Sequence, residues 1–338
     1  MAKKLGKYAF QFDKRLYVIG YGNAVGKKEG EGPLGARFDQ VEDDLYCGKK
    51  TLEQAEVHLH RVAMEYALQR ACLRPEELSL ASGGDLLNQC ISSAFSRRES
   101  RVPYLGLYGA CSTMALGTLV SALSVECGVS SHAAAFTGSH FGTAERQYRF
   151  PLEYGGQRPP AAQHTVTAAG AVILSERPSS VRLWGGAFGS ILDAGICDAN
   201  NMGGAMAPAA ARLILHYLKE TKTTPEDYDG IFTGDLGKVG SSLLLELADS
   251  EGVDLRCCYR DCGMMIYRTE EQDMHAGGSG CGCSAAVLTA EVLPRIACGD
   301  WHNVLFLSTG ALMSPLSVMQ GESISAIAHL IHLKGDAE

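Results

Sequence analysis

The amino-acid sequence predicts an α/β protein made of two similar halves, residues 1–178 and 179–338. Three observations support this fold class. Apolar, β-branched segments that are typical of strands alternate with segments of helical spacing. The same order of strands and helices occurs twice along the chain. Short segments of the first half also return in the second half at a fixed distance in the sequence.

The first half opens with RLYVIGYG, residues 15–22, an apolar segment closed by glycines that predicts a strand. The long helix expected at 51–73 has apolar residues at helical spacing, and Thr51 with Gln54 forms a capping box at its start. Further strands are predicted at 78–82, 103–109 and 133–138, with helices at 90–99 and 112–127.

The second half repeats this order, with strands predicted at 181–189, 229–234, 303–310 and 324–333 and helices at 206–219, 240–250 and 284–298. The segment GACS at 109–112 corresponds to GCGC at 280–283. Gly109 and Gly280 are 280 − 109 = 171 positions apart, and Cys127 and Cys298 keep the same distance. A repeat this long predicts a duplicated α/β unit whose halves pack together.

Composition excludes several classes of protein. The net charge is −8 and 20% of the residues are charged, which argues against a nucleic-acid-binding protein. No apolar run approaches the roughly 18 residues of a membrane-spanning helix. The N-terminal segment MAKKLGKYAFQF has charges but no apolar core, so it does not predict a signal peptide. We therefore expect synthesis in the cytoplasm.

The 12 cysteines are scattered, and in the cytoplasm most of them are expected to be reduced and buried. The densest group comprises Cys257, Cys258, Cys262, Cys281 and Cys283. Its spacing matches no standard pair of zinc ligands. The sequence therefore predicts neither a metal site nor a cofactor.

Cys111 has the clearest chemical potential. It follows Gly109 and Ala110 and directly precedes the helix expected at 112–127. Unpaired N–H groups and the dipole at a helix N-terminus favour a thiolate, so we expect the pKa of Cys111 to fall. Cys111 is predicted to line a pocket, as a nucleophile or as the remnant of one.

A duplicated α/β chain with a cysteine at the start of a central helix resembles the thiolase superfamily. The resemblance implies two mixed sheets around a buried pair of helices, here 112–127 and 284–298, in a layered αβαβα arrangement. Both segments are rich in Ala, Ser and Gly, which allow helices to approach closely. Further motifs resemble a branch of the superfamily found in spore-forming bacteria: GEGPLG at 30–35, GDLLNQ at 84–89, YGGQ at 154–157, GGAMAPAA at 203–210 and GSGCGCSA at 278–285.

The partners that a thiolase needs are replaced in this chain. Ser279 lies where thiolases have a histidine and initiating ketoacyl synthases an asparagine, and Ser308 lies at the position of the second thiolase cysteine. The histidine of those synthases corresponds to the Gly234-Asp235 segment. A serine hydroxyl is no base at neutral pH. The sequence thus predicts a pocket lined by Cys111, Ser112, Ser279 and Ser308 that binds a small carboxylate without reacting with it.

Other charged or polar residues are weaker candidates for this pocket. His140 follows the strand at 133–138, where ligand sites of α/β folds gather, and Arg146 and Arg149 could each bind a carboxylate bidentately. Asp85 and Asp235 follow strands in the two halves. They either line the site or cap turns, and the turn role is slightly favoured.

The resemblance to the sporulation branch implies a function. Such proteins bind dipicolinic acid, alone or as its calcium chelate, during its uptake into the developing spore. They act beside membrane proteins of the same system, at the inner membrane of the spore, and the superfamily implies a homodimer. A second interpretation stays open: a cysteine-dependent acyltransferase related to ketoacyl synthases, which would use Cys111 with His140 or His275 as base.

Overall fold

The two halves of the chain have the same strand order, as predicted from the repeat. The computed structural model describes residues 2–148 and 158–336, so Arg149 and the motif at 154–157 lie outside the described residues. In the first half the order is β4-β3-β5-β7-β2, and in the second it is β11-β10-β13-β14-β8. Numbered along the chain, both read 3-2-4-5-1. The fourth strand in each order, β7 or β14, is antiparallel to both its neighbours.

The strands of the first half are β2 (Ala9–Val25), β3 (Leu80–Gly84), β4 (Tyr104–Gly106), β5 (His132–Ser139) and β7 (Ala168–Ser175). Those of the second half are β8 (Val181–Phe188), β10 (Gly230–Thr233), β11 (Tyr259–Asp261), β13 (Asn303–Leu312) and β14 (Ser325–Gly335). The short strands are β1 (Lys3–Lys4), β6 (His164–Thr165), β9 (Leu192–Asp193) and β12 (Gly278–Ser279).

One long strand joins the two mixed sheets. The first part of β2 pairs with β8, up to Tyr17, and its second part, Tyr17–Val25, pairs with β7. The strands therefore form one continuous hydrogen-bonded path in place of two separate sheets. The boundary between the two domains at residues 178 and 179 stays a prediction.

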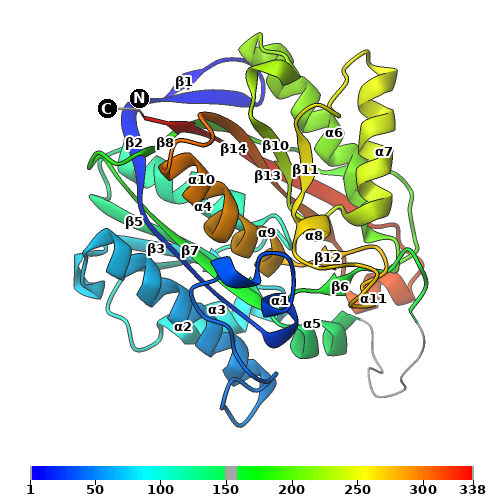
Figure 1. Ribbon diagram of the computed structural model, residues 1–338, viewed down its shortest axis with the longest axis horizontal. Coiled ribbons are helices and arrows are strands. Elements are labelled where there is room, and N and C mark those ends of the chain that lie inside the picture. Colours follow the sequence, from blue (N-terminus) through cyan, green and yellow to red (C-terminus); the bar gives the residue numbers. More distant parts are fainter. Residues whose placement is uncertain (1, 149–157, 337–338) are drawn as a thin grey trace.

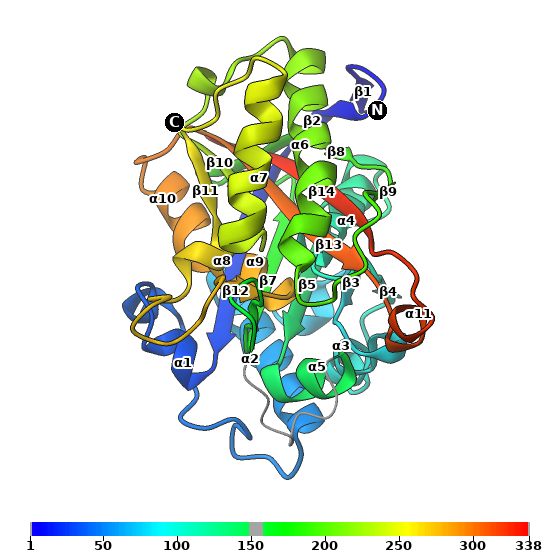
Figure 2. The same ribbon diagram turned by 90° about the vertical axis from the view of Figure 1, so that its right-hand side faces the viewer.

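Helices occupy three layers, in the expected αβαβα arrangement (Figure 1). Between the strands of the two halves lie α4 (Thr113–Glu126) and the continuous helix formed by α9 (Cys281–Val287), a π-helical segment (Leu288–Val292) and α10 (Leu293–Ala297). On the outer faces are α2 (Leu52–Ala71) and α3 (Ile91–Arg97) on one side and α6 (Met202–Thr221) and α7 (Gly237–Ser250) on the other (Figure 2).

The short helices are α1 (Lys27–Gly30), α5 (Phe141–Tyr148), α8 (Cys262–Met265) and α11 (Pro315–Met319), with 3-10 turns at Gly35–Arg37, Pro75–Glu77, Asn88–Cys90 and Pro225–Asp227. Within the part of the chain that the structure describes, no helix combines the length and apolar character that a membrane crossing requires.

Three apolar clusters fill the spaces between these layers. The largest surrounds the central helices and joins Leu119 of α4 to Leu174 of β7 and Phe306 of β13. A second cluster packs α6 against β13 and β14, and a third packs α2 against β5 and β7. Small residues allow the central helices to pack closely against the strands. A Cβ at Gly170 of β7 would lie 2.7 Å from the carbonyl oxygen of Ala285 in α9. Glycine is therefore required where β7 meets α9.

Candidate functional site

A tight turn presents Cys111 at the start of the buried helix α4. Ala110 has a left-handed backbone conformation with φ 49°, which costs a residue with a Cβ about 1–2 kcal/mol. Gly109 and Cys111 form an isolated β-bridge across the turn. From the other half, Gly310 of β13 packs so closely that a Cβ there would lie 2.4 Å from the carbonyl oxygen of Gly109. The two halves thus fix the turn between them.

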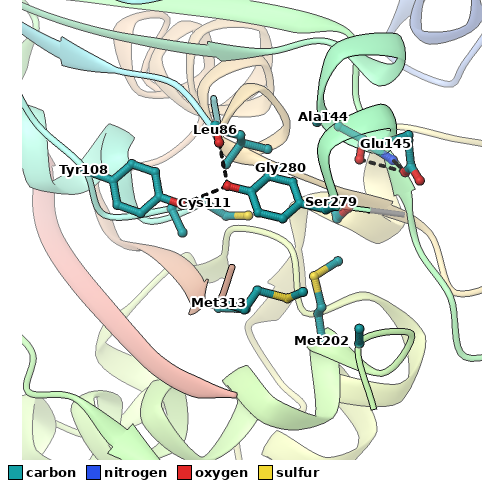
Figure 3. Close-up of a pocket in the computed structure, with 14 residues that line it drawn as sticks. Leu86, Tyr108, Cys111, Ala144, Glu145, Met202, Ser279, Gly280 and Met313 are labelled. Carbon is teal, nitrogen blue, oxygen red and sulfur yellow. Dashed lines mark hydrogen bonds between the residues drawn. The ribbon is translucent and has the colours of Figure 1, made fainter. Parts of the chain in front are cut away.

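The thiol of Cys111 faces a small cavity where the two halves meet (Figure 3). Its volume is about 40 Å³, and its surface is mostly apolar. The lining residues come from both halves: Leu86, Tyr108, Ala110, Cys111, Ala144, Glu145, Tyr148, Thr165, Ala199, Met202, Ser279, Gly280, Ala311 and Met313. A water molecule needs roughly 10–15 Å³ by this measure, so the cavity has room for a few waters.

Two tyrosines form one wall of the cavity. The hydroxyl groups of Tyr108 and Tyr148 are 3.0 Å apart, and the Tyr148 hydroxyl donates a hydrogen bond of 2.6 Å to the carbonyl of Leu86 (Figure 3). The Tyr108 hydroxyl is therefore the donor in the bond between the two phenols. The pair connects the loop before Cys111 to α5 and closes this side of the cavity.

The opposite wall carries a buried carboxylate. The parallel pairing of β6 and β12 places Thr165 beside Ser279. Glu145 of α5 accepts hydrogen bonds from the amide of Thr165 at 3.3 Å and from its hydroxyl at 2.8 Å. Glu145 is only 3% exposed, and these hydrogen bonds satisfy its buried side-chain oxygen.

Asp235 is the nearest acid to the sulfur of Cys111. It follows β10 and is fully buried. Its carboxyl accepts a hydrogen bond of 2.8 Å from the amide of Gly280 and one of 2.7 Å from the hydroxyl of Thr309. It also forms a hydrogen bond with the thiol of Cys111. Burial outweighs these bonds and raises the pKa of Asp235 to about 7.

The expected fall in the pKa of Cys111 is wrong. Burial of the thiol raises its pKa well above the usual value of 9.0, and Asp235 and Cys281 raise it further. The amide of Gly280 lowers it, but by less than these opposing effects. The N-terminus of α4 does not lower the pKa of Cys111 overall, because the sulfur is removed from water and faces a carboxyl group.

Of the predicted pocket serines, the structure brings Ser279 to the cavity with Cys111. Ser112 and Ser308 are buried nearby but are not among the lining residues. The Ser112 hydroxyl donates to the carbonyl of Gly109 at 2.6 Å. The Ser308 hydroxyl accepts a bond of 3.2 Å from the amide of Ala115. Both hydroxyls therefore hold the start of α4.

Neither histidine lies on the cavity. The His140 ring contacts the carbonyl of Leu45 through Nε2 at 2.7 Å and accepts a bond from the amide of Gly142 at Nδ1. Its burial lowers its pKa. His275 pairs with Asp273 at 3.4 Å. The described structure therefore offers the thiol no imidazole partner from either position.

Asp85 and Arg146 also lie elsewhere. Asp85 accepts bonds from the amides of Leu87 at 2.9 Å and Ser93 at 2.7 Å, which is the role of a turn cap. Arg146 forms an ion pair with Glu53 on α2 and does not line the cavity.

Sequence reasoning missed most of the cavity wall. It did not identify Tyr108 and Tyr148 on one side or Met202 and Met313 on the other, and it did not identify Glu145. Tyr108, three residues before Cys111, was the available signal. In the described ranges, no group of three or more His, Cys, Asp and Glu side chains is arranged to hold a metal ion.

Fold and site together define a protein of the thiolase-like class, and solved structures share this fold. The 3-oxoacyl-[acyl-carrier-protein] synthase III of Aquifex aeolicus matches 94% of this chain and 99% of its own, with a TM-score of 0.57 and 14% identity. OleA of Xanthomonas campestris, in complex with cerulenin, matches 95% of this chain and 97% of its own, with a TM-score of 0.61 and 13% identity.

The chain belongs to the stage V sporulation protein AD family. The profile of that family matches residues 6–334. The stage V sporulation protein AD of Bacillus subtilis is 41% identical over 327 residues, which cover 97% of this chain and 96% of the relative.

Proposed function

We propose that this protein is a non-catalytic, thiolase-like member of its family that binds dipicolinic acid and supports its uptake, with calcium, into the developing spore. The name of the family ties the protein to sporulation. The observation that carries the proposal is the pair formed by Cys111 and Asp235, in which a protonated thiol meets a carboxyl group. Such a pair leaves the thiol without the cation that would turn it into a nucleophile.

Acyl transfer to a cysteine requires a thiolate, a group that takes the thiol proton, and donors for the developing oxyanion. A pKa above 9.0 leaves Cys111 less than about 1% ionised at pH 7. Asp235 lies in the segment that corresponds to the histidine of the initiating synthases, and with a pKa of about 7 it can take a proton but cannot pair a thiolate with a positive charge. The cavity thus has the cysteine of the enzymes without the cation that activates it.

The lining of the cavity favours an uncharged form of the ligand. Among the lining residues in the described parts of the chain there is no Lys, Arg or His, whereas Glu145 contributes a carboxylate and Asp235 lies just behind Cys111. The calcium chelate of dipicolinate has no net charge and presents oxygen-seeking Ca²⁺ to Glu145. Tyr108 and Met313 supply apolar surface for the pyridine ring.

The observed cavity corresponds to a closed state. A cavity that binds benzene has a volume of roughly 150 Å³, well above the 40 Å³ beside Cys111. A pyridine ring with two carboxyl groups is larger than benzene, so a wall must move before it enters. Tyr108 is 46% exposed, and a single hydrogen bond joins its hydroxyl to Tyr148. Tyr108 is therefore the part of the wall that opens.

Calorimetry tests the proposal directly. Dipicolinate is titrated into the wild type and into Cys111→Ala and Glu145→Gln, each with and without equimolar calcium. We expect calcium to strengthen binding to the wild type, Glu145→Gln to lose that gain, and Cys111→Ala to retain binding. Glu53→Gln, on an exposed carboxylate outside this cavity, is the matched control. Absence of saturable heat under every condition refutes dipicolinate binding.

The second candidate is an acyltransferase that uses Cys111. The strained backbone at Ala110 favours it, since strain of this kind is concentrated at functional sites. Mass spectrometry after incubation with acetyl-CoA distinguishes the two functions. We expect no acyl adduct on Cys111, and an adduct that forms within minutes at pH 7 would establish the enzyme instead.

The assembly belongs to the same proposal. We infer a homodimer that acts at the inner membrane of the spore through membrane proteins of the uptake system. Sedimentation velocity tests the dimer, and a single species of 36.0 kDa would refute it. Fractionation of spores with and without those membrane proteins tests the location, which we expect to change from membrane to soluble fraction when they are removed.

A further inference from the structure

A second hollow is lined by residues of α2, of α3 and of the segments that follow these helices. Figure 1 shows the two helices on the outer face of the first half. Its volume is about 630 Å³, within the range of roughly 300–1,000 Å³ that is typical of small-molecule sites. None of its lining residues lines the cavity beside Cys111. We name it the α2–α3 groove: Arg61, Met64, Glu65, Leu68, Pro75, Glu76, Leu78, Ser96, Arg97, Glu99, Ser100, Arg101 and Val102.

The floor of the α2–α3 groove contains a largely buried cation. The guanidinium of Arg97 lies over the ring of Phe136, with its carbon 5.3 Å from the ring centroid. Burial and the charge of Arg61 lower the pKa of Arg97 to about 10, whereas the nearby carboxylate of Glu65 raises it. Within the described chain, the one hydrogen bond of this group runs from Nε to the hydroxyl of Ser96 at 3.2 Å, and it forms no ion pair.

This arrangement leaves hydrogen-bond donors facing the groove. A guanidinium carries five N–H donors in a planar fork, and Arg97 uses one of them on Ser96. No ion pair neutralises Arg97 within the described residues, although the carboxylate of Glu65 is near enough to favour its charged form. An anion in the groove would accept hydrogen bonds from the other N–H groups of Arg97 and would neutralise its positive charge. A carboxylate or phosphate can accept two such bonds from the planar guanidinium at once.

The rest of the α2–α3 groove limits what can bind. Carboxylates are found at the exposed rim, where Glu99 pairs with Arg61 at 3.2 Å. The deeper surface is apolar, with Met64 1% and Leu78 5% exposed. The groove therefore has a positive point at its base, apolar walls and a mixed, nearly neutral rim. It suits a small molecule with one anionic group and an apolar body.

We propose that the α2–α3 groove is a second binding site, which takes a small organic anion whose carboxylate or phosphate group is held by Arg97. The site is independent of the proposed dipicolinate function because the two cavities share no lining residue. If dipicolinate does not bind beside Cys111, the proposal for the α2–α3 groove is therefore unaffected, and the reverse also holds.

The test uses benzoate and phenyl phosphate as probes and benzyl alcohol as their uncharged counterpart. Binding to the full-length protein is followed by the NMR signal of the Arg97 Nε–H group and by calorimetry. We expect millimolar or tighter binding of at least one anion and none of the alcohol. Preference for benzoate or for phenyl phosphate then identifies which of the two anionic groups the site takes.

Two variants separate a binding role from a structural one. Arg97→Met keeps the apolar stem and should weaken anion binding at least about tenfold, since it removes charge-assisted hydrogen bonds. Arg74→Met, at a nearby side chain that is 80% exposed, should change it less than about twofold. Without anion, Arg97→Met should melt close to the wild type, because it keeps the apolar stem of the side chain and breaks no ion pair that the structure shows. Equal affinities of wild type and Arg97→Met, or no saturable anion binding, would overturn the proposal.

Discussion

Replacing Asp235 by Asn should change how stability depends on pH. The carboxyl of an aspartate in the unfolded chain has a pKa of 3.8, whereas that of Asp235 in the folded protein is about 7. Between these values the folded state holds a proton that the unfolded state has released. The free energy of unfolding therefore falls as the pH rises from about 4 to about 7, and it stays at the lower level above that.

The magnitude follows from the two pKa values. The difference of 7 − 3.8, at about 1.36 kcal/mol for each tenfold change, gives about 4 kcal/mol. Asn cannot ionise, and its amide can still accept from Gly280 while donating to Thr309. Between pH 4 and pH 8, the free energy of unfolding of Asp235→Asn should therefore rise relative to that of the wild type by up to about 4 kcal/mol.

Urea unfolding at a series of pH values, followed by circular dichroism, measures this difference. Asp254→Asn is the control, because the Asp254 side chain is 65% exposed and its removal should leave the pH dependence unchanged. One result would refute this reasoning: the difference in free energy of unfolding between wild type and Asp235→Asn stays constant within about 1 kcal/mol from pH 4 to pH 8. In that case the pKa of Asp235 is not raised by folding, and its carboxyl does not hold a proton beside Cys111.

Three further predictions concern the same site. Asp235→His should place a cation beside Cys111, lower its pKa and speed its alkylation by iodoacetamide at pH 7 at least about tenfold. Tyr108→Phe removes the hydroxyl that holds the closed wall, so stopped-flow fluorescence should show faster association of calcium dipicolinate. Gly310→Ala puts a Cβ 2.4 Å from the carbonyl of Gly109, so it should lower the free energy of unfolding by about 1–3 kcal/mol and weaken ligand binding.

Each of these has an internal control. Alkylation of the exposed Cys127 should be the same in all variants. Tyr46→Phe, at a tyrosine that is 50% exposed, should leave the association rate unchanged. Gly106→Ala should cost little, since its nearest neighbour lies 3.6 Å from the added carbon. Unchanged alkylation in Asp235→His, unchanged association in Tyr108→Phe, or full stability of Gly310→Ala would each contradict the geometry described above.

The fold was largely predictable because strand and helix periodicity and the repeat are local properties of the sequence. The helix predicted at 112–127 is observed as Thr113–Glu126, and the one at 284–298 as the continuous segment from Cys281 to Ala297. The π-helical turn in that segment was not predicted. Its cause is Pro294, which has no N–H to continue the α-helical pattern.

The site was less predictable because its wall is assembled from distant elements. Cys111 and Ser279 were found through motifs, but Tyr148 and Met313 reach the cavity from α5 and from the end of β13. The sign of the pKa change at Cys111 was also missed. Position at a helix start is visible in the sequence, whereas burial of the sulfur and the approach of Asp235 across the two halves are tertiary facts.

Asp235, in the segment that corresponds to the histidine of the initiating synthases, would explain how a binding protein of the kind we propose can retain the cysteine of an enzyme. Beside an imidazole, a thiol can give up its proton, and the resulting ion pair is neutral overall. Beside a buried carboxylate, the same transfer would leave the net charge of the pair unchanged and would place a thiolate next to a neutral acid, with no cation to stabilise it. The proton therefore stays on the sulfur. The geometry of the turn is kept, the nucleophile is not generated, and the cavity is left for a ligand without net charge.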